Sequence, residues 1–290
     1  MTGKIGEILI ADKLDDSFVI NSDKPFLGTA SSFDADKTLY HYDSFGHVRK
    51  KVVAVAHSMK SELRMERRSV VGICGSGPSW LFCDFACAYN DFIVVGLHEN
   101  WDVSTLIAIV QNASISCIIC GDCHTQKFLE VGACSSVKDI VLMGANNSEA
   151  QQVQSTFNIR VHSLRNFERL GLEAIENGTV STWTGAGIGL PRWMGISNGE
   201  LQSNIQKDDC DDVHTIIYTS GTTGVPKGVA ITKRRWIRDA ESNPFLAAEN
   251  PTMLSYMALA HGGDRGLWYI QKYKFSCIKY LPNINIDHKL

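Results

Sequence analysis

The sequence predicts an α/β fold with doubly wound, mostly parallel sheets. Short β-branched runs alternate with helical segments along much of the 290-residue chain, which is the pattern of parallel strands covered by helices. Apolar residues make up 44% of the chain and charged residues 20%, as in ordinary globular proteins with a sizeable core. Its apolar runs are shorter than the roughly 18 residues that a membrane-spanning helix needs, so no transmembrane segment is expected.

The opening of the chain carries the weakest pattern. Residues 1–35 are polar and weakly patterned, so we expect them to form an N-terminal arm. After Gly46, apolar residues recur at steps of three or four positions and predict one buried face of a helix. A β-branched run at Val70–Ile73 then predicts a buried strand. The residues of the helical face are Val48, Val52, Val55, Met59 and Leu63.

A glycine-rich turn follows this strand. The segment 75–78 (Gly-Ser-Gly-Pro) places Ser76 to cap a second helix, in whose first turn Pro78 is tolerated. These glycines also hint at a dinucleotide-binding loop, but the third glycine of that motif is absent, so we interpret the segment as a strand-to-helix turn. The residues expected to fill the helix are Trp80, Phe82, Cys83 and Cys87.

The alternation of strand and helix continues to residue 177 and predicts a parallel sheet. Further strands are expected at Ile93–Leu97, Ile115–Cys120, Ile140–Met143 and Ile159–His162. Further helices are expected near Ser104–Gln111, Thr125–Val131 and Arg165–Asn177.

The chain is therefore expected to divide into segments of different character. A glycine-rich stretch interrupts the alternation and is typical of a surface connection. The predicted segments are an arm (1–35), a first α/β subdomain (36–177), the glycine-rich connection (178–210), a phosphate-loop segment (211–270) and a basic tail (271–290).

The clearest functional pattern joins two expected strands, Thr215–Thr219 and Val229–Thr232. Between them lies the segment 220–228 (Ser-Gly-Thr-Thr-Gly-Val-Pro-Lys-Gly). Glycines let backbone N–H groups approach phosphate oxygens, and hydroxyls and an ammonium add further donors. The segment therefore predicts a polyphosphate-binding loop rather than a plain solvated turn. It is not a Walker A loop, because Val225 and Pro226 stand where a glycine should precede the lysine.

Residues 218–228 (Tyr-Thr-Ser-Gly-Thr-Thr-Gly-Val-Pro-Lys-Gly) resemble the signature loop of the adenylate-forming superfamily, which includes acyl-CoA synthetases and luciferases. Residues 254–261 (Leu-Ser-Tyr-Met-Ala-Leu-Ala-His) and 24–29 (Lys-Pro-Phe-Leu-Gly-Thr) are similar to segments of its long-chain acyl-CoA synthetases. The resemblance covers about residues 24–270. It implies the α/β N-terminal domain of that superfamily, incomplete at its C-terminal end.

The resemblance implies ATP-dependent activation of a fatty acid carboxylate to acyl-AMP and then acyl-CoA, as a long-chain fatty acid–CoA ligase. ATP, Mg²⁺ and coenzyme A are the implied cofactors and co-substrates. Lys227 and His261 are the implied catalytic residues, although a histidine at a strand end can also be structural. Thr222 is the implied Mg²⁺ ligand, and Arg265 is expected to be a structural or surface charge. The residues implied to hold the ATP phosphates are Thr219, Ser220, Gly221, Thr222, Thr223, Gly224, Lys227 and Gly228.

Later motifs of the resembling family have no counterpart after Tyr269. The missing motifs are a Tyr-Gly-x-Thr-Glu loop, an aspartate for the ribose and a lysine in a small C-terminal domain. We therefore expect this polypeptide alone not to catalyse the full reaction. The alternative hypothesis is a non-catalytic, truncated nucleotide-binding remnant, or a partner of a full-length synthetase.

The net charge and the cysteine content limit the kinds of partner and the cellular compartment that are expected for the protein. Lys and Arg total 28 against 31 Asp and Glu, a net charge of -3, so no nucleic-acid partner is expected. Nine cysteines without a secretory signal indicate free thiols in a reducing compartment. We expect a cytoplasmic protein that binds a fatty acid and a nucleotide. Peripheral association with the endoplasmic reticulum or peroxisome is left open.

Two further patterns can be interpreted either as structural or as functional. The run 117–124 (Cys-Ile-Ile-Cys-Gly-Asp-Cys-His) could hold a metal or haem, but alternation along a strand would point Cys117 and Cys120 to opposite faces. We interpret these cysteines as buried small hydrophobes. The basic run 233–238 is interpreted as a solvated helix face.

Overall fold

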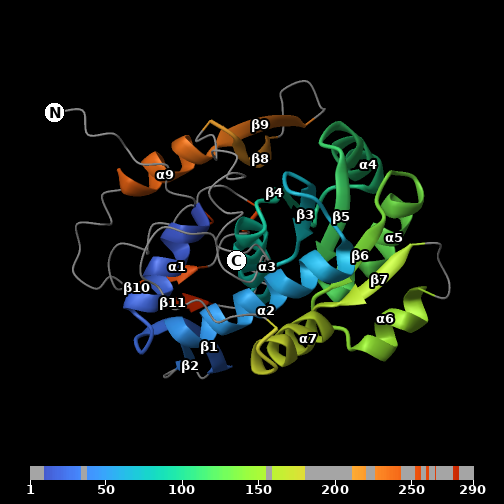
Figure 1. Ribbon diagram of the computed structural model, residues 1–290. Coiled ribbons are helices and arrows are strands. Elements are labelled where there is room, and N and C mark those ends of the chain that lie inside the picture. The colour runs from blue at the N-terminus through green and yellow to red at the C-terminus, as the bar shows by residue number, and fades with distance from the viewer. Residues whose placement is uncertain are drawn as a thin grey trace, which may run out of the picture.

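The computed structural model describes most of the chain in two sheets with helices (Figure 1). The larger sheet has seven strands in the order β7-β6-β5-β3-β4-β8-β9, and all neighbours run parallel except the antiparallel pair β8 and β9. This confirms the predicted α/β class. The described residues are 10–33, 38–154, 159–179, 211–219, 226–242, 252–255, 259–260, 265 and 277–280.

Strands of the larger sheet coincide closely with the β-branched runs of the sequence. Two of them, β4 and β5, have the predicted bounds, while β6 and β7 begin and end within one residue of the prediction. The strands are β3 (Val70–Cys74), β4 (Ile93–Leu97), β5 (Ile115–Cys120), β6 (Asp139–Leu142), β7 (Arg160–Ser163), β8 (Val213–Thr219) and β9 (Lys227–Thr232).

Helices cover both faces of this sheet and form two separate apolar cores. One core includes side chains of α2 (Phe45–Leu63), α3 (Pro78–Tyr89) and α7 (Leu164–Glu176). The other includes side chains of α4 (Val103–Asn112), α5 (Thr125–Ala133) and α6 (Asn147–Gln154). The five residues of the predicted α2 face are at most 3% exposed, and the four predicted in α3 are also buried. Such a doubly covered sheet needs its strands apolar on both faces.

Close backbone contact fixes α7 on α2. A Cβ atom added at Gly171 of α7 would lie 2.0 Å from the carbonyl oxygen of Ala54 in α2. Only glycine allows this approach. The hydroxyl of Ser58 in α2 also donates a hydrogen bond of 2.7 Å to the carbonyl of Phe167 in α7. The two helices are therefore closely packed against each other on one face of the sheet.

The N-terminal stretch corrects the expectation of an arm. It forms α1 (Ile10–Ile20), β1 (Pro25–Phe33) and β2 (Thr38–Ser44), and α1 buries Ile10, Leu14 and Phe18. Ile10, Leu14 and Phe18 recur every four residues, which is a helical spacing that the sequence does contain. Asp15 of α1 accepts hydrogen bonds from Arg49 at 2.7 Å and from the Tyr89 hydroxyl at 2.6 Å, which tie α1 to α2 and α3.

The smaller sheet joins the two ends of the sequence. Its order is β10-β11-β1-β2, with β10 (Thr252–Ser255) and β11 (Cys277–Tyr280) from the C-terminal part. Strand β11 runs parallel to β1, with Leu27 opposite Ile278 (Figure 1). Part of the expected basic tail is therefore an inner strand of this sheet, a pairing that no local pattern indicates.

The turn after β3 contains the second correction. Helix α3 begins at Pro78 as predicted, but its N-cap is Gly77, which makes no side-chain capping bond, and Ser76 is not the cap. Gly75 and Gly77 have φ values of 126° and 90°, which L-residues with a side chain rarely adopt. The segment is thus the predicted strand-to-helix turn, and its shape requires both glycines.

The basic run forms α9 (Lys233–Glu241) and is only partly solvated. Arg234 and Arg235 are exposed as expected, but Lys233 is 6% exposed and lies 2.8 Å from Asp91. Burial acts to raise the pKa of Asp91, but the hydrogen bonds and charges of Lys233 and Arg67 outweigh it and lower the pKa overall. Lys233 therefore anchors α9 to the turn before β4.

Candidate functional site at the carboxyl edge of the larger sheet

The predicted phosphate loop lies at the tip of the β8–β9 hairpin. Thr219 ends β8 and is the register partner of Lys227, which begins β9. Both side chains are exposed. The other strand next to β8 is β4, with Val94 and Val95 opposite Thr215 and Ile216. The hairpin thus fixes both ends of the loop at the carboxyl edge of the sheet. The predicted site residues Ser220, Gly221, Thr222, Thr223 and Gly224 lie outside the described residues.

Tyr218 attaches the hairpin to the rest of the domain. Its hydroxyl donates a hydrogen bond to Oδ1 of Asn112, the last residue of α4. The Tyr218 side chain is 5% exposed, and burial raises its pKa. Across the hairpin, a Cβ at Gly228 would lie 2.9 Å from Cζ of the Tyr218 ring. Gly228 therefore has a packing role beside the predicted phosphate-binding one, because the ring occupies the space of a side chain.

The segment that carries His261 lies beside the same strands. A Cβ at Gly96 in β4 would lie 2.7 Å from Cα of Ala260 and 2.9 Å from its carbonyl oxygen. Gly96 is the residue after Val95, so Ala260 contacts β4 near its carboxyl end. His261 itself lies outside the described residues. Ala260, the residue before His261, nevertheless contacts β4, and β4 pairs with β8. The segment around Ala260 and the β8–β9 hairpin therefore meet at the same edge of the sheet.

A buried arginine holds the other side of this segment. Arg265 is 2% exposed, and its Nε lies 2.9 Å from Oδ2 of Asp84 in α3. Its Nη1 donates a hydrogen bond to the hydroxyl of Thr215 in β8. The guanidinium also lies 5.5 Å from the ring centroid of Trp80 and 5.2 Å from that of Trp236. Arg265 is thus a structural charge, the first of the two alternatives that the sequence left open.

Hydrogen bonds join the segments that follow β4 and β5 at the carboxyl edge of the larger sheet. Nζ of Lys127 donates to the carbonyls of Glu99 at 2.6 Å and Trp101 at 3.2 Å. His124 Nε2 lies 3.1 Å from Oε2 of Glu99. Carboxyl ends of parallel strands are the usual place for ligands in open α/β sheets. These contacts order the edge next to the hairpin.

The cysteine-rich run is spread over both faces of the sheet. Cys117 lies in one apolar core and Cys120 in the other, which confirms the predicted alternation along β5. Cys123 is exposed. Within the described part of the chain, no group of three or more His, Cys, Asp or Glu side chains is arranged to hold a metal ion. Burial raises the pKa of Cys117 and Cys120 well above the ordinary value, so both stay protonated thiols.

Burial should decide which cysteines react. In the native protein we expect iodoacetamide to modify Cys123 and Cys134, which are exposed, before the buried thiols. Burial raises the pKa of Cys74 to about 12, which suppresses its thiolate further. Peptide mass spectrometry after timed labelling measures this order, and labelling in denaturant is the control in which every thiol reacts. Equal rates at Cys123 and Cys117 in the native protein would contradict the packing of β5.

Sequence reasoning missed the residues that position the site. Asp84 is the partner of Arg265, Thr215 accepts from it, and Gly96 admits Ala260. One signal was available, since Asp84 is the single acidic residue in the otherwise apolar helix α3. A lone buried acid in such a helix requires a cationic partner. The role of Gly96 could not be found, because it depends on a contact between distant segments.

Several solved structures share this arrangement. An adenylation domain of a carboxylate reductase from Mycobacterium chelonae superposes with a TM-score of 0.74 at 14% identity, over 96% of this chain and 43% of that one. A long-chain-fatty-acid-CoA ligase from Archaeoglobus fulgidus gives 0.69 at 15% identity, over 95% of this chain and 48% of that one. The doubly wound sheet with its loop-bearing hairpin is therefore the fold of an adenylate-forming N-terminal domain.

The chain belongs to the AMP-binding enzyme family, whose profile matches residues 27–271. Among curated relatives, fatty acyl-CoA synthetase A of Dictyostelium discoideum is 23% identical over 88% of this chain and 35% of its own length. The peroxisomal long chain acyl-CoA synthetase 6 of Arabidopsis thaliana is 25% identical over 84% of this chain and 31% of its length. The chain thus spans about a third of the length of the relatives that it matches. None of the described helices is long and apolar enough to cross a membrane.

Proposed function

We propose that this chain supplies the phosphate-binding part of an enzyme that activates a long-chain fatty acid to acyl-AMP and then to acyl-CoA. One observation carries the proposal. The hairpin that presents Thr219 and Lys227 adjoins β4, and β4 contacts Ala260 immediately before His261. Two motifs of the resembling synthetases therefore meet at the carboxyl edge of one sheet. Relatives named long chain acyl-CoA synthetases support the substrate class.

The chemistry explains why these residue types are needed. A free carboxylate is a poor electrophile, whereas its mixed anhydride with AMP carries a good leaving group. Attack of a carboxylate oxygen on the α-phosphorus forms that anhydride and breaks the bond to pyrophosphate. Protein groups mainly position the reactants and neutralise charge on the phosphates. We assign the phosphate contacts to Thr219, Ser220, Gly221, Thr222, Thr223, Gly224, Lys227 and Gly228.

Lys227 and His261 have the proposed catalytic roles. The Lys227 side chain is exposed at the start of β9. Its proposed role is to stabilise the negative charge that develops on the leaving pyrophosphate. We assign His261 to the carboxylate and the α-phosphate. A bound Mg²⁺ would neutralise phosphate charge, and Thr222 is its proposed ligand. A structure neighbour from Segniliparus rugosus was solved in complex with AMP, which supports a nucleotide as a ligand of this fold.

Exchange of pyrophosphate into ATP tests the proposal. We expect exchange that depends on a long-chain fatty acid, measured on the gene product at its native length. Replacing Lys227 by alanine should lower the exchange rate about 100-fold, since one lost charge donor in an active site has effects of this order. Lys50→Ala is the matched control, because Lys50 is exposed on α2 and remote from the hairpin. An enzyme without exchange for any fatty acid would overturn the proposal.

A non-catalytic nucleotide-binding chain is the second candidate. It shares the loop-bearing hairpin with the first candidate and differs from it in having no acid-dependent chemistry. An immunoblot with an antibody to residues 1–150 gives the native mass. A band near 32.0 kDa, with Mg²⁺·ATP binding but no acid-dependent exchange, would support this candidate. A band near twice that mass, with exchange, would support the enzyme.

The proposal also includes a thiol acceptor, coenzyme A, and a cellular location. We propose coenzyme A as the thiol that accepts the acyl group, which release of AMP on its addition would measure. A cytoplasmic location with peripheral attachment to the endoplasmic reticulum or peroxisome fits a fatty acid substrate, and two Arabidopsis relatives are named peroxisomal. Fractionation with a salt wash distinguishes attached from free protein.

A further inference from the structure

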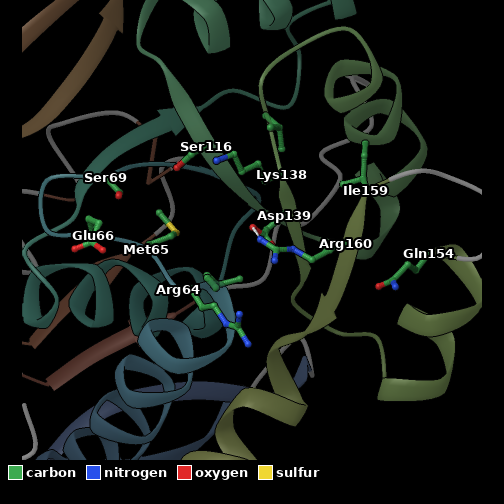
Figure 2. A pocket seen from close by; sticks show the side chains of 12 residues that line it. Arg64, Met65, Glu66, Ser69, Ser116, Lys138, Asp139, Gln154, Ile159 and Arg160 are labelled. Atoms are coloured by element: carbon green, nitrogen blue, oxygen red, sulfur yellow. Dashed lines mark hydrogen bonds and ion pairs between the residues drawn. The ribbon is translucent and has the colours of Figure 1, made fainter. Parts of the chain in front are cut away.

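A cavity of about 870 Å³ opens at the amino-terminal edge of the larger sheet (Figure 2). Its walls come from the turn after α2 and from the starts of β3, β5, β6 and β7, so it lies at the edge opposite the β8–β9 loop. The volume is in the range of small-molecule sites. The polar side chains of its lining include Arg64, Glu66, Ser69, Lys138, Asp139 and Arg160.

Uncompensated positive charge distinguishes this cavity. Asp139 is 2% exposed and lies 2.7 Å from Nη2 of Arg160 and 2.8 Å from Nε2 of His162, so its charge is balanced locally. Arg64 and Lys138 form no ion pair with any residue that the structure describes. Glu66 is the remaining acid of the lining. Two unpaired cations therefore face one unpaired carboxylate.

The two cations are held on opposite sides of the cavity. Figure 2 shows Lys138 and Arg64 at opposite ends of the lining, with Asp139 and Arg160 between them and the Lys138 side chain directed toward Ser116. The Lys138 backbone donates to Ser116 at 2.9 Å and accepts from Arg160 at 3.3 Å, which fixes its position in the sheet. Arg64 caps α2 with φ 52°, a left-handed conformation that is rare outside glycine. The backbones of both residues are therefore fixed, whereas both side chains are exposed.

We propose that this cavity binds a small organic dianion with an apolar body, and that Arg64 and Lys138 are its cationic contacts. Guanidinium and ammonium groups are the usual partners of phosphate and carboxylate oxygens. The Ser69 hydroxyl lines the same space and can donate a further hydrogen bond. A phosphate monoester and a dicarboxylate share the required chemistry. The apolar body would lie against Leu63, Met65, Val137 and Ile159.

Calorimetric titration with phenyl phosphate and with phthalate tests the proposal and separates the two ligand types. We expect saturable binding of at least one probe, and none of neutral benzyl alcohol. Arg64→Gln and Lys138→Gln should each weaken binding about tenfold, as for a lost charge-assisted contact. Glu66→Gln should strengthen it about threefold, because a repulsive charge is removed. This opposite sign would not arise from a merely structural role of Arg64 at the end of α2.

Two controls locate the binding. Arg165→Gln removes an exposed charge on α7, outside the cavity, and should leave the affinity unchanged. Lys227→Ala, at the phosphate loop, should also have no effect, so the result is independent of the function proposed above. The inference is overturned if neither probe binds, if Arg64→Gln and Lys138→Gln bind as the wild type does, or if Lys227→Ala abolishes binding. Melting temperatures confirm that each variant is folded.

Discussion

Replacing Arg265 by methionine is expected to lower the free energy of unfolding by about 3–5 kcal/mol, the usual effect of breaking a buried ion pair. Asp84 is 0% exposed and would keep a buried carboxylate without its partner. Thr215 would also lose the hydrogen bond that Arg265 donates, and Trp80 the guanidinium near its ring. Denaturant unfolding followed by tryptophan fluorescence measures the loss. A change below about 1 kcal/mol would contradict a buried pair.

A double-mutant cycle separates charge from packing at this site. Asp84→Leu alone should also destabilise the protein strongly, because Arg265 is 2% exposed and would become an uncompensated buried cation. Combining Arg265→Met with Asp84→Leu should recover much of the stability, since apolar replacement of both partners is often neutral or better. Arg234→Met is the matched control. Arg234 pairs with Asp211 on the surface, so only a small change is expected.

Substituting Gly96 by alanine is expected to lower fatty-acid-dependent ATP–pyrophosphate exchange about 10- to 100-fold. The added Cβ would lie 2.7 Å from Cα of Ala260, closer than real contacts allow, so the backbone before His261 must move. Displacements of about 1 Å in a catalytic constellation have effects of this size. This result rests on the proposed function. Its structural part, a destabilisation of about 1–3 kcal/mol by overpacking, stands independently.

Gly72 provides the matched control on the neighbouring strand. A Cβ at Gly72 would meet the side-chain methyls of Leu97 at 2.7 Å and of Ile115 at 3.3 Å, and such methyls can adjust by rotation. Gly72→Ala should therefore retain far more exchange activity than Gly96→Ala at equal protein concentration. Comparable activity in the two variants would show that the contact with Ala260 does not position the site.

Much of the larger sheet could be predicted because its information is local. A β-branched run such as Ile115–Cys120, buried on both faces, has few structural alternatives, and β5 has the predicted bounds. The periodic face of α2 was equally clear, from Val48 to Leu63. Spacing in the sequence reflects the geometry of each element, so these elements follow from short windows. Helix α1 was missed although Ile10, Leu14 and Phe18 have the four-residue spacing of a helical face.

The loop-bearing hairpin belongs to the same class of local information. Its two strands and the hydroxyl- and glycine-rich segment between them lie within residues 213–232, although β9 begins at Lys227, two residues before the predicted start. The family could therefore be inferred from the sequence alone, and the phosphate-binding role of the loop stays a prediction. The match of the family profile over residues 27–271 agrees with that interpretation.

Contacts between distant segments were decided only by the tertiary structure. The pairing of β1 with β11 joins residues about 250 positions apart, and Arg265 reaches Asp84 across 181 positions. Gly96 and Ala260 meet in the same way. Each of these contacts depends on how whole elements pack, which no short window of sequence encodes. The sequence by itself therefore determined the family and the strands on either side of the predicted phosphate loop, whereas the contact of Ala260 with β4 and the cavity at the opposite edge depended on three-dimensional packing.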